Sequence, residues 1–187
     1  MKRIGILALQ GAFAEHRKML ESLGAECVEI RRRADLKGKL DGIVLPGGES
    51  TVMGKLLQEL ELFEPLRQLV ADGLPVFGTC AGLILLAKRI AGEDTVHLGL
   101  MDITAQRNAY GRQLGSFHTQ AKFAPVGVVP MTFIRAPLIT EASPYVEILA
   151  QVNGHIVAAR QNNILVASFH PELTADTRIH AYFLSLC

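Results

Sequence analysis

Apolar runs alternate with helically spaced apolar positions along the first half of the chain. Residues 4–9 form an unbroken apolar run, which predicts a strand buried on both faces. From Phe13 to Leu23 the apolar positions recur at helical spacing, and Gly24 stands where such a helix would end. The alternation continues with strands predicted over 26–30, 42–45 and 75–79 and helices predicted over 56–72 and 81–90. This order favours a parallel sheet with helices on both faces.

The second half has a different pattern. Residues 146–152 and 155–161 flank Asn153-Gly154, which is a strong signal for a β-hairpin. Residues 164–169 predict another strand, and the segment from Ala175 is predicted to be helical. We therefore expect an α/β fold of the flavodoxin-like type, with an open, mostly parallel sheet and antiparallel additions in the C-terminal half. No linker or repeat divides residues 1–187, so a single domain is expected.

Composition narrows the function classes. The chain has 187 residues and a formal net charge of +1, which argues against a nucleic-acid-binding surface. Its three cysteines, an odd number at scattered positions, argue against a disulfide framework and a zinc site. Such a chain is expected in a reducing cytoplasm.

The N-terminus superficially resembles a signal peptide, with basic residues at 2 and 3 and residues 4–14 largely apolar. A first buried strand explains the same residues, and charged residues follow at once at 15–18. The longest apolar stretch, 74–87, is too short to span a membrane. A cytoplasmic location is therefore the expectation.

A candidate nucleophile lies between a predicted strand and a predicted helix. Gly78-Thr79-Cys80-Ala81-Gly82 has the form G-x-C-x-G, the cysteine counterpart of a nucleophile elbow. The helix N-terminus would favour the thiolate of Cys80, and the Ala81 N–H would point toward an oxyanion. The alternative is a small buried core cysteine. Cys27 and Cys187 have no comparable setting and are expected to be bystanders.

A candidate base follows the last predicted strand. His170 is followed by Pro171 and Glu172, and an extended chain would place His170 and Glu172 on one face. A carboxylate there could hold the imidazole in the tautomer that accepts a proton from Cys80. A strand-end histidine beside a solvated acid is the alternative. His16, on the apolar side of a predicted helix, is expected to pack rather than react.

A glycine-rich loop follows the third predicted strand, over residues 45–51. Gly47-Gly48 would let backbone N–H groups face a ligand, and the Gly48 N–H could be a second oxyanion donor beside Ala81. A phosphate loop would need the lysine of G-K-[ST], which is missing. An ordinary strand-to-helix connection remains the other alternative.

Together these motifs resemble the triad-type, class I glutamine amidotransferases and, more closely, the glutaminase subunits of pyridoxal 5′-phosphate synthases. The matching segments run from near the start to near the end of the chain, at 9–12, 45–51, 78–83, 107–113, 134–137 and 169–174.

The resemblance implies that Cys80 is the nucleophile and that His170 and Glu172 complete its triad. It implies hydrolysis of L-glutamine to glutamate and ammonia through a cysteine thioester, with no metal or organic cofactor. It also implies a (β/α)₈-barrel synthase partner in a large hetero-oligomeric complex, which would use the ammonia to make pyridoxal 5′-phosphate (vitamin B6). The substrate-binding residues it implies are Gly48, Glu49, Ser50, Arg107, Ile134 and Arg135.

The charges of glutamine agree with this set. Glu49 suits the α-ammonium group, and an arginine suits the α-carboxylate, although the sequence does not decide between Arg107 and Arg135. Two alternatives stay open. One is a glutaminase subunit of another class I pathway, and the other is a non-catalytic flavodoxin-like binding module with an inert cysteine.

Overall fold

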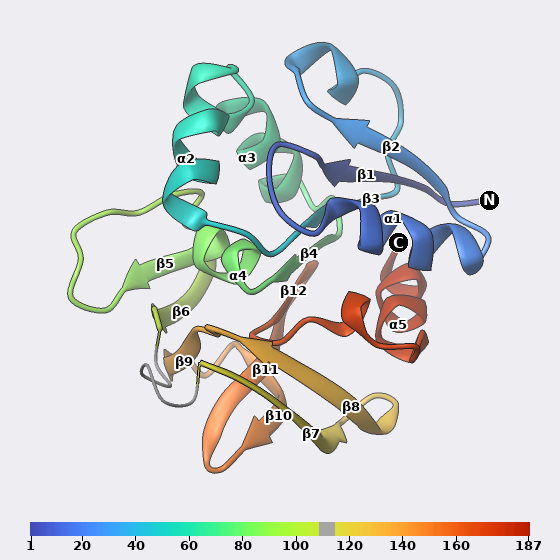
Figure 1. Cartoon of the computed structure of the whole chain (residues 1–187). Coiled ribbons are helices and arrows are strands. Elements are labelled where there is room, and N and C mark those ends of the chain that lie inside the picture. Colours follow the sequence, from blue (N-terminus) through green and yellow to red (C-terminus); the bar gives the residue numbers. More distant parts are fainter. Residues whose placement is uncertain (109–114) are drawn as a thin grey trace.

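Strands and helices alternate through the first half of the chain in the computed structural model, which describes residues 1–108 and 115–187 (Figure 1). The first strand begins and ends earlier than predicted, at Arg3 and Leu7, whereas the next two predicted strands have the expected bounds. The elements of this half are β1 (Arg3–Leu7), α1 (Phe13–Ser22), β2 (Glu26–Ile30), the 3-10 turn η1 (Arg33–Leu36), β3 (Gly42–Leu45), α2 (Ser50–Glu59), α3 (Phe63–Ala71), β4 (Val76–Thr79), α4 (Ala81–Leu86) and β5 (Ala87–Ile90).

The second half is mostly antiparallel. Asn153 and Gly154 both have positive φ, at 51° and 80°, as a type I′ hairpin turn requires. The hairpin predicted from these residues is therefore confirmed. The elements are β6 (Met101–Gln106), β7 (Ser116–Phe123), β8 (Gly127–Ile134), β9 (Leu138–Ala142), β10 (Glu147–Val152), β11 (His155–Gln161), β12 (Ile164–Ala167), the 3-10 turn η2 (Pro171–Leu173) and α5 (Arg178–Leu186).

Two helix predictions in the first half are wrong. The helix predicted over 56–72 is two helices, α2 and α3, separated at Glu61, which has a φ of 55° that a continuous helix does not allow. The helix predicted over 81–90 ends at Leu86, and the remaining residues form β5. Strand β5 pairs in parallel with β6, and this pairing overrides the helical pattern of the sequence.

One mixed sheet organises the molecule. Its strand order is β2-β1-β3-β4-β12-β11-β9-β6-β5, with β10 paired to β11, and β7 and β8 form a separate two-stranded sheet. Pairing is parallel from β2 through β12 and antiparallel across β12, β11, β9 and β6. The expected fold class, a mostly parallel sheet with antiparallel additions in the C-terminal half, is therefore confirmed.

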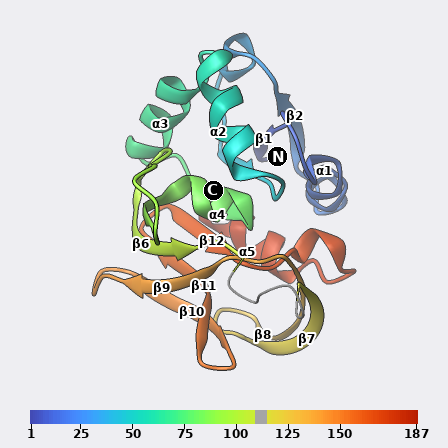
Figure 2. The same cartoon turned by 60° about the vertical axis from the view of Figure 1, so that its left-hand side comes forward.

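Each face of the sheet has its own apolar core. On one face Leu57 of α2 and Leu66 of α3 are fully buried in a cluster that includes most of α4. On the other face Leu20 of α1 and Phe183 of α5 pack with Phe133 of β8. Figure 2 shows the same division, with α2 and α3 far from the β7–β8 hairpin. The β7–β8 hairpin thus packs on the same face of the main sheet as α5.

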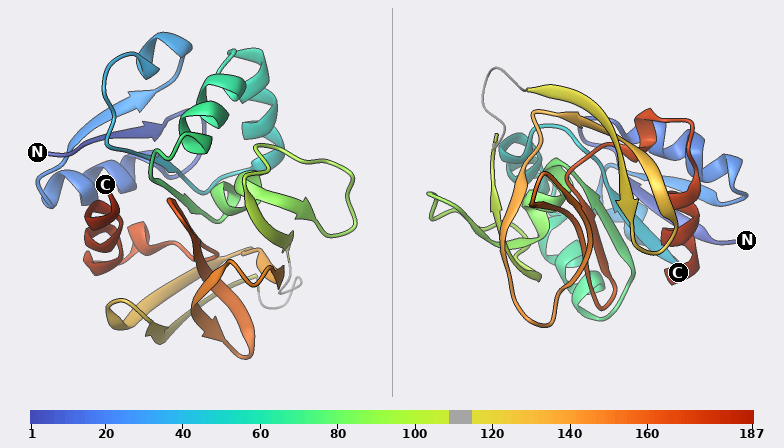
Figure 3. Two further views of the ribbon diagram at one scale, coloured as in Figure 1. Left: turned by 180° about the vertical axis from the view of Figure 1, so that it is seen from behind. Right: turned by 90° about the horizontal axis from the view of Figure 1, so that it is seen from below.

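The two chain ends lie together. Both views in Figure 3 place the N-terminus beside the end of α5, and the Lys2 ammonium donates a hydrogen bond to the Cys187 carbonyl over 2.9 Å. None of the helices in the described ranges, 1–108 and 115–187, is long and apolar enough to cross a membrane.

Candidate active site

Three neighbouring strands bring the predicted motifs together. The glycine loop follows β3, Cys80 follows β4, and His170 lies shortly after β12, and these strands are adjacent and parallel. Residues 78 and 79 of β4 pair with residues 166 and 167 of β12, and the Cys80 N–H donates to the Ala167 carbonyl over 2.8 Å. The carboxyl ends of the three strands therefore meet at one edge, where α/β proteins build their sites.

Cys80 occupies a strained elbow between β4 and α4. Its φ of 50° and ψ of −103° lie outside the regions that non-glycine residues favour. A Cβ at Gly82 would lie 2.1 Å from the Leu45 carbonyl oxygen, and one at Gly78 would lie 2.7 Å from the Gly82 carbonyl carbon. Both glycines of G-x-C-x-G are thus required by close backbone contacts. The Ala81 N–H is the first of helix α4 and has no intrahelical acceptor.

His170 and Glu172 are in contact, although not through the extended geometry that the sequence suggested. Residues Pro171–Leu173 form the 3-10 turn η2, and this turn brings Glu172 Oε1 to 2.6 Å from His170 Nδ1. Both side chains are buried. A contact through Nδ1 leaves Nε2 as the ring nitrogen available to Cys80.

The protonation states of this pair follow from burial and from their partners. Burial on its own lowers the pKa of His170, but hydrogen bonds with Cys80 and Glu172 outweigh it and raise the pKa to about 10. Burial on its own raises the pKa of Glu172, but the nearby His16 and the hydrogen bond from His170 outweigh it, and the pKa is lowered. His170 therefore holds a proton firmly beside an anionic Glu172.

Gly47 lies between the candidate base and the candidate nucleophile. A Cβ there would lie 2.3 Å from His170 Cε1 and 3.3 Å from Cys80 Cβ, so no side chain fits. The Gly47 carbonyl accepts a hydrogen bond from the Ala12 N–H over 3.1 Å. Because C=O and N–H point in opposite directions across a trans peptide, this bond makes the Gly48 N–H point away from Ala12.

A pocket of about 600 Å³ opens in front of these groups. Every residue of the predicted site except Glu172 lines it, and Glu172 lies behind His170. The predicted residues that line the pocket are Gly48, Glu49, Ser50, Cys80, Ala81, Arg107, Ile134, Arg135 and His170.

Arg107 is fixed at the wall of this pocket by two neighbours. Its Nε donates to Glu93 Oε1 over 2.7 Å, and its Nη1 contacts the Ser50 hydroxyl. Ser50 is buried at the pocket wall, where its hydroxyl lies against the Arg107 guanidinium. A guanidinium held at two of its five N–H groups keeps its remaining donors in a fixed plane. Residues 109–114 lie outside the described residues, and they include 109–113 of the segment 107–113 that contributed to the resemblance.

Glu49 has a structural contact that the sequence did not reveal. Its Oε2 accepts from the Val52 N–H over 3.0 Å and caps the N-terminus of α2. Its own N–H donates to Gln10 Oε1 over 2.7 Å, which connects the glycine loop to the segment after β1. Glu49 still lines the pocket, so its carboxylate is both a cap and part of the wall.

Ile134 and Arg135 approach the nucleophile from the end of β8. The Ile134 carbonyl oxygen lies 4.0 Å from Cys80 Sγ. Arg135 has a φ of 43° and its N–H donates to the Gly115 carbonyl, and this turn directs the segment past the pocket. Both arginines proposed for the substrate carboxylate therefore border the same pocket, Arg107 held by Glu93 and Arg135 by its backbone.

Three residues at or behind this site were not predicted from the sequence to belong to it. Gln10 and Glu93 contact predicted site residues, and His16 lies 3.4 Å from Glu172. Glu93 and Gln10 give no sequence signal because their partners are distant in the chain. His16 gave one, since it is a histidine on an apolar helix face.

The other two cysteines have different surroundings. Burial raises the pKa of the Cys27 thiol to about 11 and that of the Cys187 thiol to about 12. Both are therefore protonated and unreactive at neutral pH. Among the residues at 1–108 and 115–187, no group of three or more His, Cys, Asp or Glu side chains is arranged to hold a metal ion.

Known proteins are similar to this chain over almost its whole length. Residues 6–187 match the model of the SNO glutamine amidotransferase family. The chain belongs to this family. It is 58% identical over 188 residues to the pyridoxal 5′-phosphate synthase subunit PdxT of Streptococcus pneumoniae serotype 4, covering 99% of this chain and 97% of that protein. A glutamine amidotransferase releases ammonia from the side-chain amide of glutamine, so the chain is an enzyme of this class.

Solved structures agree with the family assignment. A crystal structure described as a glutamine amidotransferase superposes with a TM-score of 0.93 at 44% identity, covering 98% of this chain and 97% of that one. The PurLQS structure from Thermotoga maritima superposes with a TM-score of 0.72 at 14% identity, covering 98% of each chain. At that identity the second likeness concerns the fold alone.

Proposed function

We propose that this family member hydrolyses L-glutamine to glutamate and ammonia and supplies the ammonia to a pyridoxal 5′-phosphate synthase, with Cys80, His170 and Glu172 as its triad. The observation that carries the proposal is the buried contact from His170 to Glu172 beside the strained Cys80, at the edge of a pocket with cationic and anionic walls. The 58% identity to the synthase subunit PdxT favours this pathway over another class I pathway and over a non-catalytic module.

The first half-reaction begins at the sulfur. The Cys80 thiolate attacks the side-chain amide carbon of glutamine, and the amide oxygen becomes an oxyanion. Backbone N–H groups of Gly48 and Ala81 stabilise that charge, an effect worth about 3–4 kcal/mol for each donor. His170, whose pKa is raised to about 10, then gives its proton to the departing nitrogen, and ammonia leaves.

The second half-reaction releases glutamate. Neutral His170 takes a proton from water, and the resulting hydroxide attacks the thioester carbonyl. A second oxyanion forms on the same backbone donors and collapses, with loss of the Cys80 thiolate. Glutamine and water thus become glutamate and ammonia, and the enzyme is unchanged. No step requires a metal or an organic cofactor.

The charged groups of glutamine match charged residues of the pocket and give the substrate an orientation. The α-carboxylate suits the guanidinium of Arg107, which Glu93 and Ser50 hold in one orientation, and Arg135 borders the same space. The α-ammonium group suits Glu49, and Ile134 forms an apolar part of the wall. Glutamine would then extend its amide toward Cys80.

The second reaction needs a partner. We propose a (β/α)₈-barrel synthase subunit as the acceptor of ammonia, in a large hetero-oligomeric complex in the cytoplasm, where the free thiol of Cys80 stays reduced. The relative's description as a synthase subunit supports a separate partner. Stimulation of glutamine hydrolysis by that partner is expected.

The test measures glutamate release by the purified chain with and without the synthase subunit. Cys80→Ala should abolish turnover, because the thioester cannot form. Cys27→Ser is the matched control, since that thiol is half-buried in β2, away from the pocket, and it should retain wild-type activity. Turnover that survives Cys80→Ala would overturn the triad, and absence of turnover even with the partner would overturn the pathway.

A further inference from the structure

Two histidines form a buried pair behind the triad. His16 on α1 and His180 on α5 are both fully buried, and His16 Nδ1 lies 2.8 Å from His180 Nε2. The two residues are 164 positions apart in the chain. Burying two polar rings costs free energy unless their hydrogen bonds are satisfied, so their contacts matter for the fold or for the site.

The other nitrogen of His16 faces the catalytic groups. His16 Nε2 lies 3.1 Å from the hydroxyl of Thr79, the residue before the nucleophile, and 3.4 Å from Glu172 Oε2. His170 occupies the other carboxylate oxygen, Oε1, at 2.6 Å. Oε2 is buried and has no hydrogen-bond partner among residues 1–108 and 115–187. His16 Nε2 is therefore the group placed to hold the free end of the carboxylate.

The carboxylate of Glu172 determines which ring nitrogens of His16 and His180 carry protons. An ionised carboxylate only accepts hydrogen bonds, so the ring nitrogen that faces it must carry a proton. A neutral His16 protonated at Nε2 has an unprotonated Nδ1, which must accept from His180 Nε2–H. His180 Nδ1 is then an unprotonated acceptor, and it is one of the buried atoms without a partner in the described part of the chain. The unpaired atom is thus an acceptor and not an N–H.

Both rings stay neutral at physiological pH. Burial lowers the pKa of His16, with nearby Glu172 and Glu15 acting against it and His170 acting with it. Burial and the neighbouring His16 lower the pKa of His180 well below its ordinary value. These are the titratable groups that face His16 from α1, α5 and the turn η2. The pair therefore acts as a fixed dipole aimed at Glu172.

We infer that His16, oriented by His180, is a positioning residue that holds Glu172 ionised and correctly turned toward His170. The inference rests on the proposed glutaminase reaction. Both carboxylate oxygens of Glu172 then face a histidine, with a hydrogen bond from His170 at Oε1 and with His16 Nε2 3.4 Å from Oε2. Loss of His16 would let the carboxylate rotate and would make its protonation easier.

The test compares two replacements of His16 across a pH series, with the partner subunit present. In His16→Leu, kcat should fall roughly 10-fold, a part of the 10²- to 10⁴-fold that a positioned base contributes. The KM for glutamine should stay unchanged, because His16 does not line the pocket. The acidic limb of the kcat profile should move to higher pH, because the anionic carboxylate loses the N–H group that faces its Oε2. His16→Gln restores an N–H donor and should recover most of kcat.

A matched control separates positioning from stability. Leu20→Ala alters a buried apolar side chain of the same helix, so it should lower stability and leave the acidic limb in place. An acidic limb that does not move in His16→Leu, or that moves equally in Leu20→Ala, would overturn the inference. If His16→Leu does not fold, His180→Phe removes only the donor to His16 and should shift the limb in the same direction.

A second readout does not depend on turnover. The pH dependence of Cys80 alkylation by iodoacetamide reports the same coupled groups through the thiolate. His16→Leu should shift this alkylation profile, whereas Leu20→Ala should not. A wild-type chain that shows the profile but no glutaminase activity would defeat the proposed function and would still test His16.

Discussion

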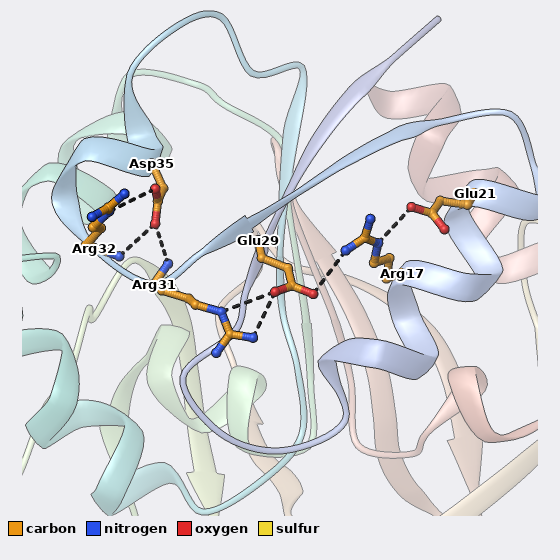
Figure 4. Close-up of polar contacts among 6 residues, drawn as sticks. All are labelled: Arg17, Glu21, Glu29, Arg31, Arg32 and Asp35. Atoms are coloured by element: carbon orange, nitrogen blue, oxygen red, sulfur yellow. Dashed lines mark hydrogen bonds and ion pairs between the residues drawn. The ribbon is translucent and has the colours of Figure 1, made fainter.

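Adjacent residues of one helix build two polar networks that differ in almost every physical respect. Arg17 points outward from α1, where its guanidinium contacts Glu21 at 2.8 Å and Glu29 at 3.1 Å (Figure 4). Glu29 also forms an ion pair with Arg31. The chain of ion pairs across α1 and β2, here called the outer ladder, consists of Glu21, Arg17, Glu29 and Arg31. His16 points inward and is fully buried. It contacts the side chains of His180, Thr79 and Glu172, and these residues together with His170 form the inner network.

The comparison predicts that burial, rather than the number of contacts, determines how much a polar group contributes to activity and stability. The outer ladder has full charges and short distances, but it lies in water and salt, which screen it. The inner network pairs the charge of Glu172 with that of protonated His170, and it cannot exchange its partners for water. Changes to the inner network should therefore alter activity and acid stability, while changes to the outer ladder should have small effects.

The largest expected effect is from Glu172→Gln. Glutamine has the shape of glutamate but lacks the negative charge that stabilises a protonated His170. We expect kcat to fall by about 10²- to 10⁴-fold while the protein stays folded. Steady-state glutamate release with the partner subunit measures this, and circular dichroism checks the fold.

Glu64→Gln is the control for this substitution, because Glu64 is exposed on α3 and outside the active-site pocket. It should leave kcat unchanged. Retention of more than about a tenth of the activity in Glu172→Gln would show that the charge of Glu172 contributes little, since a positioned base is worth at least 10²-fold.

The inner network should also make the protein acid-sensitive. His16 and His180 have lowered pKa values in the folded state, so below the ordinary value of 6.5 the unfolded chain binds more protons. Stability should therefore fall as pH decreases from 6.5 toward 5, by up to about 1.4 kcal/mol per pH unit for each histidine. His170 acts oppositely: its stabilising contribution is complete below 6.5 and is lost as pH rises through about 10.

Urea unfolding between pH 7.5 and 5 measures this slope. His180→Phe removes one titrating group and should flatten the slope, whereas Leu20→Ala removes no titratable group and should lower stability equally at each pH. The same slope in wild type and in His180→Phe would mean that folding does not lower the pKa of His180.

The motifs proposed to be catalytic were recognisable in the sequence because each is local. G-x-C-x-G around Cys80 has its glycines two positions on either side, where close backbone contacts require them. His170 and Glu172 are also two apart, so their contact was expected even though the turn that makes it was not. The strands of the parallel half were predictable for the same reason, because each is a local, unbroken apolar run.

The remaining features depend on contacts between distant segments. Nothing near His16 in sequence indicates His180, and nothing near Arg107 indicates that Glu93 fixes it. The helix predicted through residue 90 failed because a short apolar run fits a strand equally well, and only pairing with β6 decides between them.

The smallest expected effect is from Glu29→Gln in the outer ladder. Glu29 contacts both Arg17 and Arg31, and these contacts hold its pKa below the ordinary value, with the hydrogen bond from Arg31 first among the causes. Removing its charge should cost less than about 1 kcal/mol of unfolding free energy, because exposed ion pairs contribute little. The difference from wild type should shrink further in 1 M salt, at a Debye length of about 3 Å. Glutaminase activity should be unchanged, since the ladder does not border the pocket. A loss of unfolding free energy above about 2 kcal/mol that persists in high salt would mean that the outer ladder contributes as much as a buried network. The contrast between the two sides of α1 would then be wrong.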